Sequence, residues 1–248
     1  MNKLTLVLLA AASFAQDARQ IVEESQKRNR STTQQYEGVL QVFNSNGKNS
    51  EKRWQFFRSG NYGESKALLR FVSPPEVKGV ALLIVNHPDR ASDQWMWLPE
   101  LQRERRVALQ DRSTRFFGTD FSYEDLEERD VNQSDFKLLG EETADGQACW
   151  KIESTPKKGK SSQYNRVVMW IRKDIYFPVQ YEMFAKEKLV RKLHYRRVEK
   201  VSGVWSALEM EMFDVRRKGR TVLKSDKLQY NVPLKDELFT LQSLRRGE

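Results

Sequence analysis

The four residues Trp95-Met96-Trp97-Leu98 constrain the fold more than any other stretch of this 248-residue chain. Side chains along a β-strand alternate between its two faces, so a strand with one wet face shows apolar and polar residues in turn. Here both alternating sets are apolar. Pro99 ends the strand, because it has no N–H for a sheet hydrogen bond. The stretch therefore predicts a sheet that is covered on both faces.

The residues after this strand predict a basic edge followed by a short helix. The run from Arg103 to Arg106 contains three arginines, and Gly118 later interrupts the chain. Thr119 or Asp120 is suited to cap a helix over Phe121-Ser122-Tyr123-Glu124-Asp125-Leu126, whose acidic residues would lie near its positive N-terminal end. We expect this helix to cover the sheet; the pattern alone also fits a hairpin followed by a surface turn.

The first fifteen residues have the pattern of a secretory signal peptide. Lys3 supplies a positive charge, Leu4 to Ala12 is apolar, and Ser13-Phe14-Ala15 fits a cleavage site. The apolar segment holds about nine residues, whereas a membrane-spanning helix needs about 20. We therefore expect cleavage near Ala15 and a soluble mature protein, residues 16–248, in a bacterial periplasm or outside the cell.

Charge and cysteine content limit the partners and the means of stabilisation. The formal net charge is +9, which favours contact with anionic membrane surfaces or acidic ligands, or serves solubility alone. The export signal argues against nucleic acid as a partner. Cys149 is the single cysteine, so no disulfide within the chain can form and the core must hold the fold.

Most of the remaining chain has the period-two pattern of β-strands. An amphipathic helix is predicted over Asp17 to Arg30, and the alternation begins at Gln34. Asn44 to Gly47 and Asp145-Gly146 are hairpin signals, and Lys235 to Leu244 predicts a helical turn packed on the sheet. About eleven strands with short connections predict a single mainly β domain, one large curled antiparallel sheet. Its concave face would be filled by side chains or left as a ligand cavity.

No catalytic set stands out in the sequence. His87 in a turn and His194 in a strand are interpreted as structural, and there is no nucleophile elbow, zinc motif or phosphate-binding glycine loop. The carboxylates from Glu124 to Asp130 lack the spacing of a calcium loop and are interpreted as a solvated acidic helix face. Cys149 is interpreted as a small buried hydrophobe. We therefore expect no cofactor, no bound metal and no enzyme activity.

Several other strands are also apolar on both faces, as in the pair Trp54 and Phe56 opposite Phe57. The second cover is either a helix packed as core or an apolar ligand, for which adaptable methionine side chains are suitable. Basic residues gather within 191–197 and within 216–220. They fit either a rim around a cavity or a strand edge guarded by charge against aggregation.

A set of motifs in fixed order resembles the periplasmic outer-membrane lipoprotein-sorting (LolA-like) proteins, in the branch that carries G-T-D-F-x-Y-E-D-L. The resemblance covers nearly the whole mature chain. It implies a half-open antiparallel β-barrel whose apolar concave face is covered by helices and accepts acyl chains. The motifs are Trp95-Met96-Trp97-Leu98-Pro99, Arg105-Arg106, Gly118-Thr119-Asp120-Phe121-Ser122-Tyr123-Glu124-Asp125-Leu126, Cys149-Trp150 and Asp236-Glu237-Leu238-Phe239-Thr240.

The resemblance and the apolar pattern together imply a set of binding residues. Arg105 and Arg106 are expected at the rim or as a latch for the lid. The apolar cavity and its lid are expected to comprise Trp54, Phe56, Leu83, Val85, Trp95, Trp97, Leu98, Phe121, Tyr123, Leu126, Met169 and Met210.

The expected function is that of a non-enzymatic periplasmic carrier or chaperone for the acyl chains of a lipid or lipoprotein. Its expected partners are an inner-membrane transporter of the RND type and an outer-membrane acceptor, with transient contact at membrane surfaces. The alternative is an accessory interaction module of an RND-type exporter, with its cavity filled by its own side chains.

Overall fold

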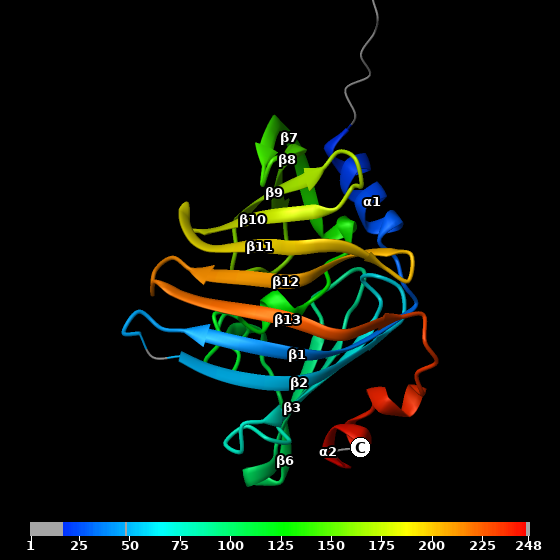
Figure 1. Ribbon diagram of the computed structural model, residues 1–248, viewed down its shortest axis with the longest axis vertical. Coiled ribbons are helices and arrows are strands. Elements are labelled where there is room, and N and C mark those ends of the chain that lie inside the picture. Colours follow the sequence, from blue (N-terminus) through cyan, green and yellow to red (C-terminus); the bar gives the residue numbers. More distant parts are fainter. Residues whose placement is uncertain (1–16, 48, 247–248) are drawn as a thin grey trace, which may run out of the picture.

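The computed structural model describes residues 17–47 and 49–246, and the predicted signal peptide lies outside them. Within them, thirteen strands form one large antiparallel sheet that curls without closing (Figure 1). No helix among the described residues is long and apolar enough to cross a membrane. The strands are β1 (Thr33–Phe43), β2 (Asn49–Ser59), β3 (Lys66–Ser73), β4 (Ala81–Val85), β5 (Asp93–Leu98), β6 (Arg103–Arg106), β7 (Ser134–Ala144), β8 (Gln147–Pro156), β9 (Arg166–Arg172), β10 (Pro178–Ala185), β11 (Lys188–Val201), β12 (Val204–Asp214) and β13 (Gly219–Tyr230).

The mainly β fold is as predicted, and the strand count is slightly higher than expected. The strand that the sequence pattern missed is β6, because its four residues, Arg-Glu-Arg-Arg, are all charged and give no apolar alternation. It pairs with β5, where Trp95 lies opposite Arg106 and Leu98 opposite Arg103. A short 3₁₀ turn, η1 (Pro99–Leu101), joins the two strands.

Two predicted hairpins are confirmed. The turn after β1 is closed by a hydrogen bond of 3.0 Å from the Gly47 amide to the Asn44 carbonyl. The turn between β7 and β8 has positive φ at both Asp145 (49°) and Gly146 (74°). Positive φ at both central residues is the requirement of a type I′ hairpin, which explains the Asp-Gly sequence.

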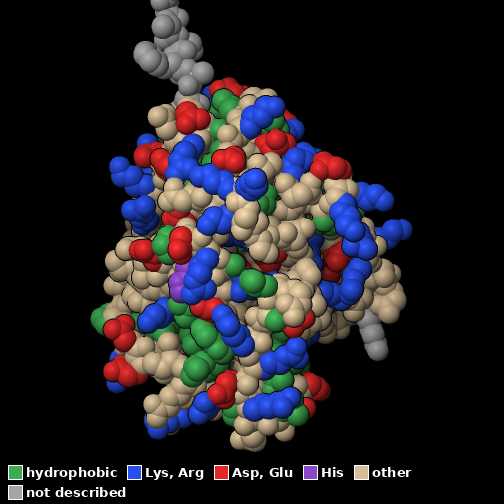
Figure 2. Space-filling model, turned by 180° about the vertical axis from the view of Figure 1, so that it is seen from behind, with side chains coloured by type: hydrophobic (Ala, Val, Ile, Leu, Met, Phe, Trp, Pro, Cys, Tyr) green, Lys and Arg blue, Asp and Glu red, His purple; other side chains and the backbone are tan. Residues whose placement is uncertain are grey.

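The order of the strands forces one long connection across the sheet. That order is β6-β5-β4-β3-β2-β1-β13-β12-β11-β10-β9-β8-β7, so consecutive strands β6 and β7 form the two opposite edges. Residues 107–133, which we name the crossing segment, must run from one edge to the other. The segment lies behind the sheet in Figure 1, and the sheet curls around it. Figure 2 views this concave side and shows Lys and Arg side chains spread over it.

The crossing segment is irregular rather than helical. It contains three short 3₁₀ turns, η2 (Leu109–Asp111), η3 (Glu124–Leu126) and η4 (Val131–Gln133). The helix expected over residues 121–126 is therefore reduced to one turn with Tyr123 at its N-cap position. The expected caps have other roles, because the Thr119 hydroxyl donates to the Phe116 carbonyl at 2.7 Å and the Asp120 carboxylate accepts from the Thr221 hydroxyl at 2.7 Å.

The predicted N-terminal helix is present as α1 (Ala18–Arg28) and covers the concave face near β7 to β9. Asp17 caps it, since its side chain accepts from the Arg19 amide. Ile21 and Val22 are 0% and 5% exposed, and they pack with Trp150, Ile152, Met169 and Ile171 of the sheet.

The C-terminal helices cover the opposite, convex face, whereas the helical cover had been expected on the concave face. They are η5 (Asp236–Phe239) and α2 (Leu241–Arg246). Phe239 and Leu244 pack on Leu83 and Trp97, while the neighbouring side chain Leu82 points to the other face. The two-sided cover predicted for β4 and β5 is thus formed by the crossing segment on one face and the C-terminal helices on the other.

The core under the first half of the crossing segment is aromatic. Trp54 packs against Phe71 and Phe116, with ring centroids 5.8 and 6.1 Å apart, and all three side chains are 1–2% exposed. Gly38 on β1 lies opposite Trp54 on β2, and a Cβ added to Gly38 would lie 1.7 Å from Trp54 Nε1. The indole therefore occupies the space that any other residue at position 38 would need.

We predict that Gly38→Ala lowers the free energy of unfolding by about 1–3 kcal/mol, as overpacked core substitutions do. Urea denaturation followed by circular dichroism measures this. Because the clash is with the indole, Gly38→Ala combined with Trp54→Phe should be less destabilised than the sum of the two single variants. An unchanged denaturation midpoint for Gly38→Ala would refute this account of the packing.

Candidate functional site

The crossing segment divides the concave face into a packed half and a hollow half. Over β1 to β5 the face is filled, because Val107, Phe116 and Tyr123 of the segment pack into the sheet core there. Over β7 to β13 the sheet, α1 and residues 124–130 instead surround a cavity of about 480 Å³. Ligand pockets in proteins typically measure about 300–1,000 Å³, so the hollow half is large enough to bind a small ligand.

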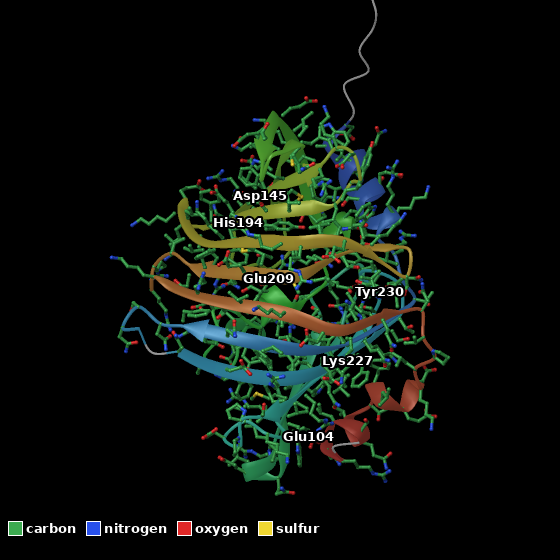
Figure 3. The ribbon with its side chains drawn as sticks, viewed as in Figure 1. Glu104, Asp145, His194, Glu209, Lys227 and Tyr230 are labelled. Atoms are coloured by element: carbon green, nitrogen blue, oxygen red, sulfur yellow. The ribbon has the colours of Figure 1, made fainter. Side chains whose placement is uncertain are left out.

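The wall of the cavity is mostly apolar and rich in aromatic and methionine side chains. Polar groups at the wall are partly satisfied within it, since the Ser206 hydroxyl donates to the Tyr230 hydroxyl at 2.9 Å. Tyr230 lies toward the C-terminal end of β13 (Figure 3). The large apolar side chains of the wall are Phe136, Met169, Phe177, Tyr181, Met183, Tyr195, Trp205, Met210 and Met212, with Val22 of α1 opposite them.

The acidic residues of the crossing segment are paired with arginines, which corrects the prediction of a solvated acidic face. Glu124 is 7% exposed, and the side chains of Asp125 and Glu127 are only 3% and 2% exposed. Each carboxylate pairs with a different arginine. The pairs are Glu124 with Arg129, Asp125 with Arg191, Glu127 with Arg112 and Glu128 with Arg58.

Asp125 is the centre of a polar network at the wall of the cavity. Its carboxylate accepts from the Ser122 amide and hydroxyl, both at 2.7 Å, and from the Tyr164 hydroxyl at 2.7 Å. Arg191 donates to it at 3.1 Å and also to Gln163 at 3.0 Å. Arg191 itself is 6% exposed. The network ties residues 122–125 to β11 and to the loop before β9.

Glu127 and Glu128 connect the same segment to the first half of the sheet, through Gln94 of β5 and Arg58 of β2. Glu127 accepts from Arg112 at 2.8 Å and from Gln94 at 3.0 Å. Burial raises the pKa of the Glu127 carboxyl, because the loss of water outweighs the attraction of Arg112. Glu128 accepts from Arg58, from the Gly63 amide at 3.0 Å and from the Ser65 hydroxyl at 2.8 Å. The segment is thereby held on both sides of the cavity mouth.

The structure brings only some of the predicted binding residues to the cavity. Met169 and Met210 line it. Phe121 lies beside the cavity, packed with Met183, Leu193 and Met212. The others lie elsewhere: Trp54, Phe56, Leu98, Tyr123 and Leu126 belong to the packed half, and Leu83, Val85, Trp95 and Trp97 face the C-terminal helices on the convex side.

The expected latch residues form ion pairs with carboxylates outside residues 121–126. Arg105 pairs with Asp111 at 3.1 Å, but the two side chains are 61% and 38% exposed, so the pair contributes little to stability. Arg106 pairs with Asp93 and lies over the Trp95 ring. The sheet arginines that hold the crossing segment beside the cavity are instead Arg58 of β2 and Arg191 of β11.

Sequence analysis missed Met183 and Met212 among the residues of the cavity wall. A signal for Met212 was present, because Met210 and Met212 are two residues apart and so share one face of β12. Arg191 was assigned to a basic cluster, and its burial depends on Asp125, which is 66 residues away in the sequence. No local pattern reveals a pair at that separation.

Comparison with known proteins finds the same fold in several solved structures. A DUF1329 family protein from Desulfovibrio piger is 29% identical with a TM-score of 0.87, over 92% of this chain and 97% of that one. A putative outer membrane lipoprotein-sorting protein domain from Vibrio parahaemolyticus is 26% identical with a TM-score of 0.87, over 92% and 98%. A LolA superfamily protein from Nitrosomonas europaea is 19% identical with a TM-score of 0.73, over 92% and 100%. A search of curated proteins finds no match.

The curled, half-open sheet has the LolA-like fold, which it shares with these solved structures. The sequence model of a family described as uncharacterized proteins matches residues 63–246, most of the chain. The chain belongs to this family.

We predict that Asp125→Ala lowers the free energy of unfolding by about 3–5 kcal/mol, because it leaves the buried Arg191 without its carboxylate. Amide hydrogen exchange of residues 121–126 should accelerate as well. Urea denaturation and exchange mass spectrometry measure the two effects. Asp89→Ala is the matched control, since Asp89 is exposed and its carboxylate has no partner among the described residues. Equal stability of the two variants would contradict the role given to Asp125.

Proposed function

We propose that this protein is a non-enzymatic carrier that holds an acyl chain of a lipid or lipoprotein in the cavity beneath α1 and residues 124–130. The observation that carries the proposal is the cavity itself. A fold whose concave face is packed solid over one half retains about 480 Å³ of unfilled space, lined by apolar side chains, over the other.

The size of the cavity suits one long acyl chain. A methylene group takes about as much room as a water molecule, roughly 30 Å³, so the cavity would hold on the order of sixteen methylenes. Burying a methylene contributes about 0.8 kcal/mol, which amounts to roughly 12 kcal/mol for such a chain. Free diffusion of a lipid between membranes is therefore negligible, and a protein cavity that offsets this cost permits it.

The composition of the wall suits a cargo of variable shape. Met169, Met183, Met210 and Met212 all line the cavity, and methionine has three rotatable bonds and a polarisable sulfur. Such side chains adapt to chains of different length and saturation. Phe177, Tyr181 and Trp205 supply larger, more rigid contact surface.

Loading and release require the cavity wall to move. Residues 124–130 are attached to the sheet through a few side-chain pairs, chiefly Asp125 with Arg191 and Glu128 with Arg58, whereas α1 packs on the sheet through Ile21 and Val22. Breaking these ion pairs costs free energy, which lowers the net binding energy of the cargo. The cargo can therefore leave again. No catalytic group is needed for this cycle.

A carrier of this kind acts between two membranes, so we place the mature protein in the periplasm. The partners proposed from the family resemblance are an inner-membrane transporter of the RND type as donor and an outer-membrane acceptor. The basic surface of the protein, with a net charge of +9 for the whole chain, favours transient contact with anionic membrane surfaces.

The packed half of the concave face favours a second function, that of an accessory module of an RND-type exporter. Phe71, Phe116 and Phe117 fill that half, with ring centroids 5.2–5.6 Å apart. A module with this function would bind its partner through its surface and would keep the cavity empty of lipid.

The carrier function is tested by extracting the mature protein from its native periplasm without detergent and analysing bound lipid by mass spectrometry. Titration with a fluorescent fatty-acyl probe then measures affinity. A co-purifying lipid and saturable probe binding, displaced by unlabelled palmitate, support the carrier function. The absence of both would overturn it and favour the accessory module.

We predict that Ala207→Phe weakens binding of the acyl probe by at least tenfold. Ala207 lines the cavity, and the added ring would displace several methylenes at about 0.8 kcal/mol each. Ala148→Phe is the matched control, because Ala148 is exposed on β8 and lines no part of the cavity. Urea denaturation confirms that both variants remain folded. Unchanged affinity in a folded Ala207→Phe variant would show that the ligand does not occupy this cavity.

A further inference from the structure

A second depression in the surface has several arginines among its lining residues. It is a groove of about 880 Å³ between residues 113–115 of the crossing segment, the start of β11 and the turn from β12 to β13. Figure 2 shows basic side chains gathered around a hollow on the right side of that view. The charged residues that line the groove are Arg115, Arg191, Arg216, Arg217 and Asp214.

The positive charges of two of these arginines are largely unpaired. Arg216 is exposed and makes no ion pair among the described residues. Arg217 is also exposed, and its only carboxylate neighbour is Asp214 at 4.0 Å. Asp214 is largely occupied otherwise, since one of its oxygens accepts from the Arg216 and Arg217 amides at 3.0 Å each.

The other two arginines are fixed in place. Arg115 donates to the Thr119 carbonyl at 2.7 Å and to Asp120 at 3.2 Å, which directs its guanidinium. Arg191 is more than nine-tenths buried, and its Nε has no hydrogen-bond partner although its Nη1 binds Asp125, Gln163 and Tyr164.

The lining charges favour an anion. Arg115 pairs with Asp120 and Arg191 pairs with Asp125, so the excess positive charge at the groove is that of Arg216 and Arg217 against the single carboxylate of Asp214. Guanidinium groups present planar pairs of N–H donors that match phosphate and carboxylate oxygens. A tetrahedral phosphate can accept from several converging arginines at once, whereas a planar carboxylate has only two oxygens to share among them.

We propose that this groove binds a phosphate group, carried either by a lipid head group or by a free phosphate ester. The site is distinct from the acyl cavity. Arg191 and Gln163 line the groove, whereas Ser162, Tyr164 and Leu193 line the cavity. The proposal does not require the cavity to be occupied, and it stands or fails independently of the carrier function.

The test is a titration of the ¹⁵N-labelled mature protein with inorganic phosphate and with glycerol phosphate at low ionic strength. We expect saturable shifts of amide signals in residues 113–115 and 214–218. In Arg216→Glu/Arg217→Glu, binding should weaken at least tenfold. The matched control Lys78→Glu/Arg103→Glu makes the same charge change at two exposed residues that line neither depression, and it should stay within about twofold of the unmodified protein.

Vesicles distinguish the two sources of phosphate. Binding to phosphatidylglycerol vesicles but not to phosphatidylcholine vesicles, lost in the Arg216→Glu/Arg217→Glu variant alone, assigns the groove to a lipid head group. Binding of the soluble phosphates without vesicle binding assigns it to a free phosphate ester. No saturable binding in any arm, or an equal loss in both double variants, overturns the proposal, because the effect would then be absent or due to overall charge.

Discussion

The structure depends on one topological constraint, which is that the chain leaves the sheet at one edge and re-enters it at the other. β1 pairs with β13 in the middle of the sheet, so β6 and β7 are its two edges, and residues 107–133 must cross the concave face. Over β1 to β5 the segment contributes aromatic side chains that fill the face. Beyond Glu124 it contributes mainly charged side chains, which cannot pack into an apolar wall. The same connection therefore builds the core of one half and leaves the other half hollow.

Four buried or half-buried carboxylates of the crossing segment each pair with an arginine at this boundary, Asp125 and Glu128 with arginines of the sheet and Glu124 and Glu127 with arginines of the segment itself. Buried ion pairs gain little net stability over an apolar contact, because desolvation offsets most of the attraction, yet removing one partner is strongly destabilising. Such pairs define the position of the segment without making its contact with the sheet hydrophobic. This suits a cavity wall that must separate from the sheet and return to the same place, as the carrier function requires.

The sequence predicted the architecture well and the site only in part. Period-two patterns and turn residues such as Asp145-Gly146 located the strands, since these signals are local. The strand from Trp95 to Leu98 is apolar on both faces, which correctly predicted that both faces of the sheet are covered. The alternation does not show which of the two sets of side chains faces the concave side. Trp97 consequently lies under Phe239 rather than in the cavity. The partners of Asp125 and Glu128 are distant in the sequence, so their burial could not be foreseen from a run of acidic residues.

The most direct test of the account uses the methionine methyl groups, because four of the chain's six methionines line the cavity and Met96 belongs to the packed half. The measurement is a methyl NMR titration of mature, ¹³C-methionine-labelled protein with palmitate. The account predicts saturable shifts of Met169, Met183, Met210 and Met212 with little change at Met96. Saturable palmitate binding that shifts Met96 and leaves the other four unchanged, or no binding at all, would contradict it.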